Sequence, residues 1–232
     1  MANVLFDVNG TLLDPRALTA SWPGAPSGLG LSVLDQTVLQ SMVDTMTGEF
    51  RPFSEYIRAA LAHRAALLGL GDDAVEAGMA AAAALPAYPD AADALARLRV
   101  AGHTPSAVTN SAADAARSAL GEAGLLEHMH AVVGADSAGA YKPDPRVYRN
   151  AIDALGLDPA DTWFVAGHWW DVTGAKRAGL RTAWVARDEG ILLATAPEPD
   201  VTAGDLKAAA EAIAAAESPG ASRPSTPRPG SR

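Results

Sequence analysis

Two aspartates, each following a short apolar run, are the residues of this chain best placed to do chemistry. Asp7 follows the run at 4–6, and Asp171 comes soon after the run at 162–166. A carboxylate at the carboxyl end of a buried parallel strand lies where open α/β sheets hold their ligands. Such a carboxylate can attack a substrate and form a covalent ester. We expect Asp7 to be this nucleophile, and Asp171 to orient or deprotonate the water that hydrolyses the ester. Capping of the following helix is a second role open to Asp171.

Four further side chains could complete a site around Asp7. An aspartate is a weak nucleophile, so it needs a neighbouring cation in a dry pocket, and Lys142 can supply one. A solvated surface lysine is the alternative reading of that residue. Thr11, Thr109 and Asn110 are hydrogen-bond donors suited to a substrate carboxylate or phosphate. Ordinary capping and turn roles are the alternative for these three residues.

Three ring-bearing residues lie in or near the same segments. His168 stands three residues before Asp171. It could activate water, bind a substrate anion or receive a leaving group, or it could simply pack beside the neighbouring tryptophans. Trp170 could form the wall of an apolar pocket or fill the core, and Tyr148 could pair with Asp171 or Lys142 or pack in the core.

These residues need a fold that brings distant parts of the chain together. Short apolar runs predict strands, and apolar residues at three- and four-residue spacing predict helices. Strands are predicted at 4–6, 106–108, 131–133, 162–166 and 182–186, and helices at 90–99, 112–121, 145–155 and 172–178. We expect Asp90 to cap the first of these helices. Strands alternating with helices indicate an α/β fold with a doubly wound parallel sheet, a Rossmann-like core. The carboxyl ends of its strands converge on one crevice, where Asp7, Lys142 and Asp171 can meet.

An all-helical segment interrupts this alternation. Residues 15–30 are rich in proline, glycine and serine and are predicted to be an irregular linker, and helical spacing continues from there to about residue 85. The predicted units are therefore a catalytic core of residues 1–14 and 89–216 and a helical insertion of residues 15–88. The segment 217–232 is rich in proline, serine and glycine, and we expect a disordered tail.

Four segments of the chain carry motifs in a recognisable order. They are Asp-Val-Asn-Gly-Thr-Leu at 7–12, Val-Thr-Asn-Ser at 108–111, Tyr-Lys-Pro-Asp-Pro-Arg-Val-Tyr at 141–148, and the segment 164–171 that runs into Gly174. They resemble motifs I to IV of the haloacid dehalogenase superfamily of hydrolases, over residues 3 to 190. The Trp-Asp-x-x-Gly-Ala sequence and the spacing from lysine to tyrosine are most similar to the type II, or L-2-haloacid, dehalogenase branch.

The resemblance implies a hydrolase that uses Asp7 as an aspartate nucleophile through a covalent ester. It implies that the insertion is a cap domain that closes over the crevice and supplies substrate specificity. The implied reaction is the hydrolytic dehalogenation of a small 2-haloalkanoic acid. We expect the catalytic residues to be Asp7, Lys142, Asp171 and His168. We expect the substrate-binding residues to be Asn9, Thr11, Gln36, Arg51, Thr109, Asn110, Tyr148 and Trp170.

Two positions depart from the phosphatases of this superfamily. Those enzymes carry a second aspartate two residues after the nucleophile, which protonates the leaving alcohol, and Asn9 stands at that position here. They also carry an acidic residue four positions before the motif IV aspartate, where this chain has Gly167. Mg²⁺ prefers several hard oxygen ligands. We therefore expect no metal and no other cofactor, unless the phosphatase alternative holds and Mg²⁺ is required. A halide leaves without a proton, so both changes suit cleavage of a carbon–halogen bond.

Other positions depart from the dehalogenase branch itself. That branch usually has tyrosine at the position of Asn9, and serine and asparagine at the positions of Ala166 and His168. An arginine near the start of the cap normally receives the halide. The best local match for it here is Gln36, with Arg51 as a displaced substitute, and glutamine solvates a halide less well than a fixed cation.

The composition of the chain limits the classes of partner that it is expected to bind. The 232 residues carry a net charge of −9 without a basic patch, so no nucleic acid is expected. No apolar run approaches a membrane span and no signal segment is evident, so we expect a cytoplasmic protein with a small-molecule anionic substrate. A homodimer is one option for the oligomeric state. A small-molecule phosphatase and a catalytically weak binding protein with the same fold are the alternative functions.

Overall fold

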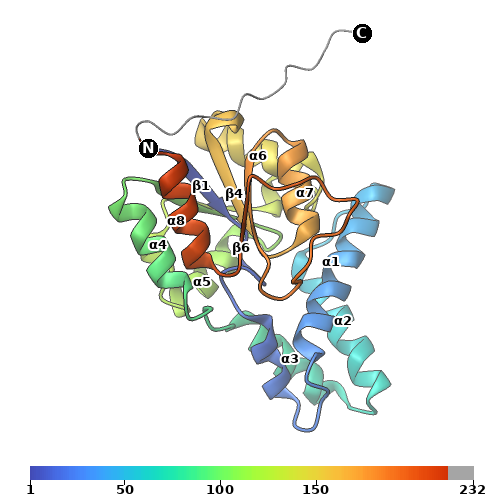
Figure 1. Ribbon diagram of the computed structural model, residues 1–232. Coiled ribbons are helices and arrows are strands. Elements are labelled where there is room, and N and C mark those ends of the chain that lie inside the picture. The colour runs from blue at the N-terminus through green and yellow to red at the C-terminus, as the bar shows by residue number, and fades with distance from the viewer. Residues whose placement is uncertain (219–232) are drawn as a thin grey trace.

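A six-stranded parallel sheet forms the centre of the molecule. The computed structural model describes residues 1–218 (Figure 1). The strands are β1 (Asn3–Phe6), β2 (Thr104–Thr109), β3 (Val132–Gly134), β4 (Thr162–Ala166), β5 (Arg181–Val185) and β6 (Val201–Ala203). Their order is β3-β2-β1-β4-β5-β6, and every neighbouring pair is parallel. This confirms the predicted doubly wound α/β fold. From β1 the sheet grows first toward β2 and β3 and then, on the other side of β1, toward β4, β5 and β6. Such sheets bind ligands at the point where this direction reverses.

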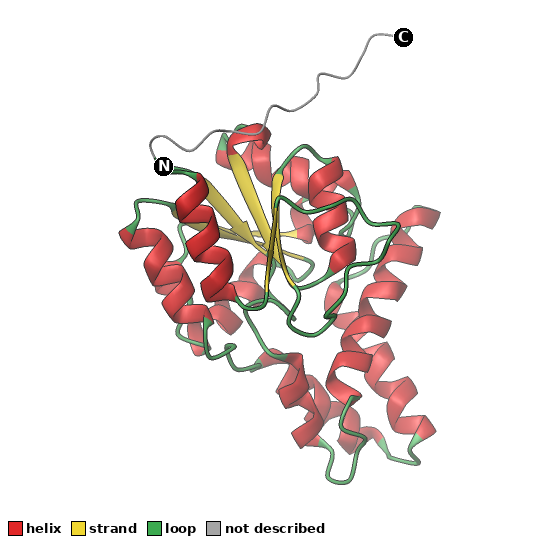
Figure 2. Ribbon diagram, viewed as in Figure 1, coloured by secondary structure: helices red, strands yellow, loops and turns green. Residues whose placement is uncertain are grey.

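Helices cover both faces of this sheet (Figure 2). They are α4 (Ala91–Val100), α5 (Ala113–Glu122), α6 (Pro145–Leu155), α7 (Trp169–Arg177) and α8 (Leu206–Ala216). Apolar residues of α4, α5 and α8 pack in one buried cluster, and those of α6 and α7 pack in another. Short 3₁₀ turns lie at Leu126–His128, Ala135–Ser137 and Pro159–Asp161.

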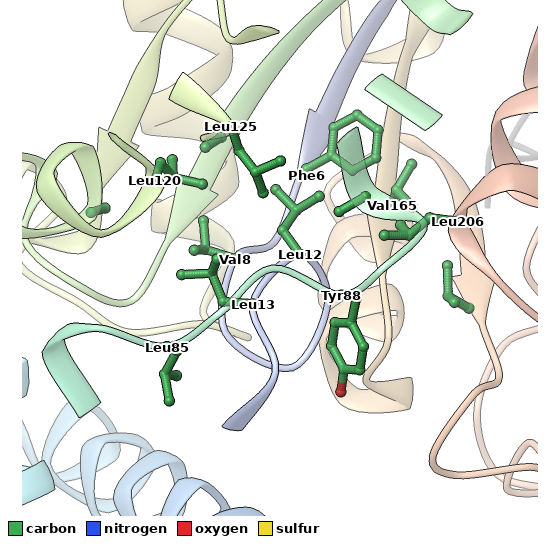
Figure 3. Packing of buried hydrophobic residues seen from close by; sticks show 14 of the residues in the cluster. Phe6, Val8, Leu12, Leu13, Leu85, Tyr88, Leu120, Leu125, Val165 and Leu206 are labelled. Atoms are coloured by element: carbon green, nitrogen blue, oxygen red, sulfur yellow. The ribbon is translucent and has the colours of Figure 1, made fainter. Parts of the chain in front are cut away.

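Alternation along the strands explains why both faces can be covered. Val4 and Phe6 of β1 belong to the α4/α5/α8 cluster, whereas Leu5 belongs to the α6/α7 cluster. This is the two-residue period of a strand buried on both faces. Figure 3 shows Phe6 and Val165 of the neighbouring strands in the larger cluster. The sheet is thus buried from both sides and holds the strand ends rigidly.

The segment between β1 and α4 is helical. It contains α1 (Leu29–Thr47), α2 (Phe53–Leu67) and α3 (Asp72–Ala83). The predicted irregular linker at 15–30 is only partly correct, because a 3₁₀ helix, η1 (Pro15–Ser21), occupies its first half. Asp14 caps η1 by accepting a hydrogen bond from the Arg16 N–H, and proline at the first helical position fits this start.

The two connections between this helical insertion and the sheet lie side by side. The Tyr88 N–H donates to the Leu12 carbonyl (2.9 Å) and the Asp14 N–H donates to the Pro86 carbonyl (2.8 Å). The chain therefore leaves and re-enters the core through one short paired segment. The division of the chain at residues 14/15 and 88/89 remains a prediction.

Asp90 does not cap its own helix, contrary to the prediction. Its side chain makes no capping hydrogen bond to α4. The carboxylate instead accepts from the Arg187 guanidinium (2.6 and 2.7 Å) and from the Leu206 N–H at the start of α8 (2.7 Å). The Arg187 guanidinium offers a charge-assisted hydrogen bond that the N–H groups of α4 cannot. The residue therefore ties together α4, α8 and the segment after β5, which are distant in sequence.

The structure bears on two further predictions, the disordered tail and the absence of a membrane span. From residue 219 onward, the predicted disordered tail at 217–232 lies outside the described residues. Within residues 1–218, no helix is long and apolar enough to span a bilayer.

Gly30 is predicted to set the position of α1. A Cβ at this residue would lie 2.0 Å from the Pro15 carbonyl oxygen, whereas one at Gly28 would meet nothing within 4 Å. We expect Gly30→Ala to lower the free energy of unfolding by about 1–3 kcal/mol, the usual cost of overpacking. Gly28→Ala, at the helix N-cap, should cost no more than about 1 kcal/mol. Urea unfolding of both variants checks this, and equal losses would contradict it.

Candidate active site

The site lies where three neighbouring strands end. Asp7 follows β1, Thr109 ends β2 and Asp171 lies in the first turn of α7 after β4. Lys142 comes from the loop between β3 and α6 and joins them. The structure therefore brings together residues that are 29 to 135 positions apart in the sequence.

Lys142 is bound between the two aspartates. Its Nζ donates to Asp7 Oδ1 and to Asp171 Oδ2, both at 2.8 Å, and its side chain is fully buried. The ammonium also lies 5.1 Å from the centre of the Phe164 ring. The backbone N–H of Lys142 donates to Asn110 Oδ1 (2.9 Å), which fixes the loop that carries the lysine. A buried charge requires such a set of partners.

The two aspartates have opposite pKa shifts although they share one cation. Burial raises the pKa of Asp7, but Lys142, His168 and the Thr11 hydroxyl together lower it below its usual value. Burial and the neighbouring charge of Asp7 raise the pKa of Asp171 to about 6, despite its bonds to Lys142 and Tyr148. Asp7 is thus kept ionised as a nucleophile requires. Asp171 titrates near neutral pH, as an acid–base group requires.

Thr11 links the first and last motifs. Its hydroxyl donates to Asp7 Oδ2 (2.7 Å) and accepts from the Gly167 N–H (2.8 Å). The hydroxyl therefore positions Asp7, and its expected role in binding substrate remains a prediction. Gly167 itself is crowded, because a Cβ there would lie 2.6 Å from the Gly10 carbonyl oxygen. An acidic side chain at this position would require the two loops to move apart.

The remaining second-motif and third-motif residues differ in their roles. The Thr109 hydroxyl accepts from the Ser111 N–H (3.2 Å), which is turn chemistry. Tyr148 donates to Asp171 Oδ1 at 2.6 Å, and its ring packs edge-on against Phe164. Gly174 makes room for this pair, since a Cβ there would lie 2.5 Å from the Tyr148 oxygen. Tyr148 therefore both packs in the core and binds the second carboxylate.

A small cavity lies directly over Asp7. Its volume is about 10 Å³, room for about one water molecule. The lining residues come from the motif loops and from α1 and α2: Asp7, Asn9, Leu34, Val38, Phe53, Thr109, Asn110, His168 and Trp170. Leu34, Val38 and Phe53 belong to the helical spacing pattern, which predicts helices and says nothing about this role.

A larger cleft adjoins this cavity. It has a volume of about 360 Å³ and lies between the insertion and α5, and five of its lining residues are alanines of α3 and α5. Asn9 and Phe53 line both spaces. The Asn9 amide also donates to the Ser111 hydroxyl at 3.5 Å. These two residues therefore lie where the cleft meets the cavity at Asp7.

Gln36 and Arg51 do not line the cavity over Asp7. Gln36 is only partly exposed and hydrogen-bonds His63 across α1 and α2 (2.8 Å). Arg51 forms an exposed ion pair with Asp44 (3.0 Å). An α-helix turns about 100° per residue, so Gln36 lies about 200° around α1 from Leu34. The face of α1 that reaches the cavity is therefore apolar, and the expected binding roles of Gln36 and Arg51 remain predictions without support from their positions.

His168 lies on the opposite wall of the cavity. Its ring stacks on Trp170 with centroids 5.3 Å apart, and its Nδ1 lies 3.7 Å from Glu189 Oε1. Burial lowers the pKa of His168, but Glu189, Asp7 and Asp171 raise it above its usual value overall. Sequence reasoning did not identify Glu189, because no motif or spacing marks this loop residue after β5.

Asp171 does not cap α7. The helix begins at Trp169, three residues earlier than predicted, so Asp171 lies inside its first turn and His168 takes the N-cap position. The Glu189 carboxylate accepts from the Trp169 N–H (2.8 Å) instead. Asp171 is thereby left with both oxygens bonded to Lys142 and Tyr148. Within residues 1–218, no three histidine, cysteine or acidic side chains are grouped to hold a metal ion.

Comparison with known proteins identifies the family to which this chain belongs. Residues 1–179 match the haloacid dehalogenase-like hydrolases. An (S)-2-haloacid dehalogenase of Xanthobacter autotrophicus is 35% identical over 190 residues, which cover 79% of this chain and 74% of the relative. A phosphoserine phosphatase of Thermus thermophilus is 38% identical over 125 residues, covering 53% of this chain and 49% of the relative.

Solved structures show the same architecture. The L-2-haloacid dehalogenase of Xanthobacter autotrophicus with chloropropionic acid covalently bound superposes with a TM-score of 0.84 and 26% identity. The match covers 92% of this chain and 98% of that one. The likeness extends to the helical insertion as well as to the sheet.

Lys142→Met should strongly destabilise the protein. The substitution leaves two buried carboxylates without their cation, which costs about 3–5 kcal/mol when one partner of a buried pair is removed. Lys176→Met is the control, because its ion pair with Asp200 is partly exposed and should cost at most about 1 kcal/mol. Urea unfolding measures both. If the loss of stability in Lys142→Met is caused by the two unpaired carboxylates, adding Asp7→Asn and Asp171→Asn should restore stability. Failure to restore it would contradict this explanation.

Tyr148→Phe should raise the pKa of Asp171 above its present value of about 6. The tyrosine O–H donates to the ionised carboxylate, and its removal favours the protonated form. Below this pKa Asp171 is neutral, so the ionised form should appear at higher pH in the variant. Carboxyl ¹³C NMR across pH 4–9 follows the titration, and Asp171→Asn identifies the resonance. An unchanged or lowered pKa would refute the assignment.

Proposed function

The chain belongs to the haloacid dehalogenase-like hydrolases, and from this membership and the geometry at Asp7 we propose that it hydrolyses the carbon–halogen bond of a small 2-haloalkanoic acid. The observation that carries the proposal is the Asp7–Lys142–Asp171 arrangement, with Asn9 beside it in place of an acid. The relative from Xanthobacter autotrophicus is named for (S)-2-haloacids, and we propose the same enantiomer here. A cytoplasmic location and a homodimer stay predictions.

In the first step, a carboxylate oxygen of Asp7 attacks C2 of the substrate. The carbon–halogen bond breaks and the halide departs with the bonding electrons, leaving an ester between Asp7 and the 2-alkanoate. Lys142 and Thr11 hold the carboxylate in place for this attack. A fixed and partly dehydrated nucleophile has less reorganisation to make before it reacts. No proton is transferred, so the lack of an acid at Asn9 has no cost in this step.

In the second step, water attacks the carbonyl carbon of the Asp7 ester. Asp171, in its ionised form above pH 6, orients this water and takes its proton. The ester bond to the Asp7 carbonyl carbon breaks as Asp171 returns its proton to the departing alkoxide, which leaves as the 2-hydroxy acid. Asp7 then releases the remaining water proton to solvent and is restored as a carboxylate. One oxygen of Asp7 then comes from water. The oxygen of the product's 2-hydroxyl group comes from Asp7. An isotope label carried by the solvent water therefore enters Asp7 before it reaches the product.

A phosphatase of the same fold is the second candidate, favoured by the partial match to the phosphoserine phosphatase. Asn9 has no proton to give to a leaving alkoxide. The crowding of Gly167 against the Gly10 carbonyl also excludes an acidic side chain there in this conformation. These two features favour halide displacement over phosphoryl transfer.

A single turnover in H₂¹⁸O should place one ¹⁸O atom in the peptide that contains Asp7. The reason is that water attacks the Asp7 carbonyl in the second step. Peptide mass spectrometry after excess enzyme is mixed with (S)-2-chloropropionate detects the label. Asp7→Asn, checked for the absence of deamidation, should lose halide release, whereas Asp153→Asn on the exposed face of α6 should keep it. A label found only in the product would reject the covalent mechanism.

Halide release should survive exhaustive treatment with EDTA. Displacement of a halide needs neither an acid nor a Lewis acid, and Lys142 supplies the positive charge between the carboxylates. Chloride release from 2-chloropropionate and phosphate release from phosphoserine are to be measured with EDTA and with added Mg²⁺. Activity that is abolished by EDTA, restored by Mg²⁺ and greater on the phosphate ester would establish the phosphatase alternative.

A further inference from the structure

The cavity over Asp7 has to accept an anion next to several negative charges. Asp7 lines the cavity, Asp171 is fully buried close by, and Lys142 is already shared between the two. The face of α1 that lines the cavity offers only Leu34 and Val38. An anionic substrate would therefore meet a net negative site unless another cation is available.

His168 is the one residue of the cavity lining that can carry a positive charge. Its side chain is only 12% exposed, and its Nε2 is buried without a hydrogen-bond partner. A buried ring nitrogen without a protein partner is unusual, and it is free to hydrogen-bond a ligand. Nε2 points toward the loop after β1, since a Cβ at Gly10 would lie 2.4 Å from it. Stacking on Trp170 holds the ring in this plane.

Glu189 is rigidly placed on the other side of the imidazole. Its Oε2 accepts from the Trp169 N–H at the start of α7 (2.8 Å) and from the Trp184 indole N–H of β5 (3.2 Å). Its Oε1 lies 3.7 Å from His168 Nδ1. The indole N–H of Trp184 also donates to the Gly167 carbonyl (3.2 Å), so the same tryptophan fixes both the glutamate and the motif IV loop.

We propose that His168 and Glu189 form an anion-receiving pair in this site. Glu189 is a positioning residue that faces Nδ1–H, so that the charged imidazole presents Nε2–H to the substrate's carboxylate or to the departing halide. The inference rests on the proposed function and deepens it. His168 thereby supplies the cation that the sequence leads one to expect on α1.

Acidic groups face His168 from every element packed around it. They are Asp7 after β1, Asp171 on α7, Glu189 after β5 and Asp35 on α1, with the Lys142 ammonium as the opposing charge. Burial opposes the charged imidazole, but these carboxylates raise its pKa overall. Because the charged form binds the anion, binding is strong below that pKa and is lost as pH rises through it.

The pH profile of kcat/KM tests the role of Glu189. Glu189→Gln keeps an oxygen for the Trp169 N–H but removes the charge that faces Nδ1. The alkaline limb should move to lower pH by roughly one unit, the usual effect of one neighbouring charge, and the two proteins should become more alike at low pH. Asp188→Asn is the matched control, because that neighbouring carboxylate pairs with Tyr88 and Arg16 and should leave the limb in place. An unmoved limb in Glu189→Gln, or a loss of equal size at all pH values, would overturn the proposal.

Direct binding identifies the anion and does not depend on turnover. Calorimetry at pH 6 and pH 9 measures bromide and propionate binding to the wild-type protein and to His168→Gln. Weaker bromide binding in the variant assigns the pair to the halide, and weaker propionate binding assigns it to the carboxylate; either result supports the inference. Equal binding of both anions to the two proteins overturns it. Failure of the wild-type protein to release halide would instead count against the proposed function, whatever the binding result.

Discussion

A single buried ammonium between two carboxylates is the constraint on which the rest of this site depends. Removing Lys142 and its partners from water costs several kcal/mol per ion, and only close pairing with complete hydrogen bonding offsets such a cost. Each carboxylate oxygen has a donor: Lys142 and Thr11 for Asp7, and Lys142 and Tyr148 for Asp171. The close-packed loops around Gly10 and Gly167 follow from this requirement, because the carboxylates and their donors come from three separate segments.

The symmetric pairing still produces two different carboxylates. Asp7 lines the cavity, whereas Asp171 is fully buried behind it with both oxygens bonded. Burial without further donors raises the pKa of Asp171 to about 6, while the added charge of His168 helps to lower the pKa of Asp7. The proposed nucleophile and the proposed acid–base group thus share one cation. Both are aspartate carboxylates, and only their different surroundings give them different pKa values.

Sequence reasoning succeeds where one local signal decides the structure. The apolar runs ending at Phe6 and Ala166 predict their strands, and the proline at 145 marks the start of α6 as observed. The parallel sheet then explains why Asp7, Lys142 and Asp171 converge. The family resemblance supplied the motifs, and the sequence already admits a pairing of Tyr148 with Asp171, whereas the bond from Thr11 to Asp7 is seen only in the structure.

The failures have physical causes of the same kind. Gln36 fits the expected place in the sequence but faces outward, because the register of α1 on the core cannot be read from spacing alone. Asp90 is of a residue type favoured at helix N-caps and directly precedes α4, but it binds Arg187 and the start of α8 instead. Glu189 has no local signal, since its importance arises from the β5 and α7 elements that meet it. Long-range partners outcompete local ones in each case.

The central position of β1 has a consequence for the order of assembly. The strand that leads to Asp7 is made first, yet its two neighbours in the sheet begin at residues 104 and 162. Contacts between such distant positions require closure of long loops and slow the search for the native topology. During synthesis, Asp7 therefore lacks its contacts with Lys142 and β4 until most of the chain has left the ribosome. The chemistry of the first ten residues is among the last parts of the molecule to be completed.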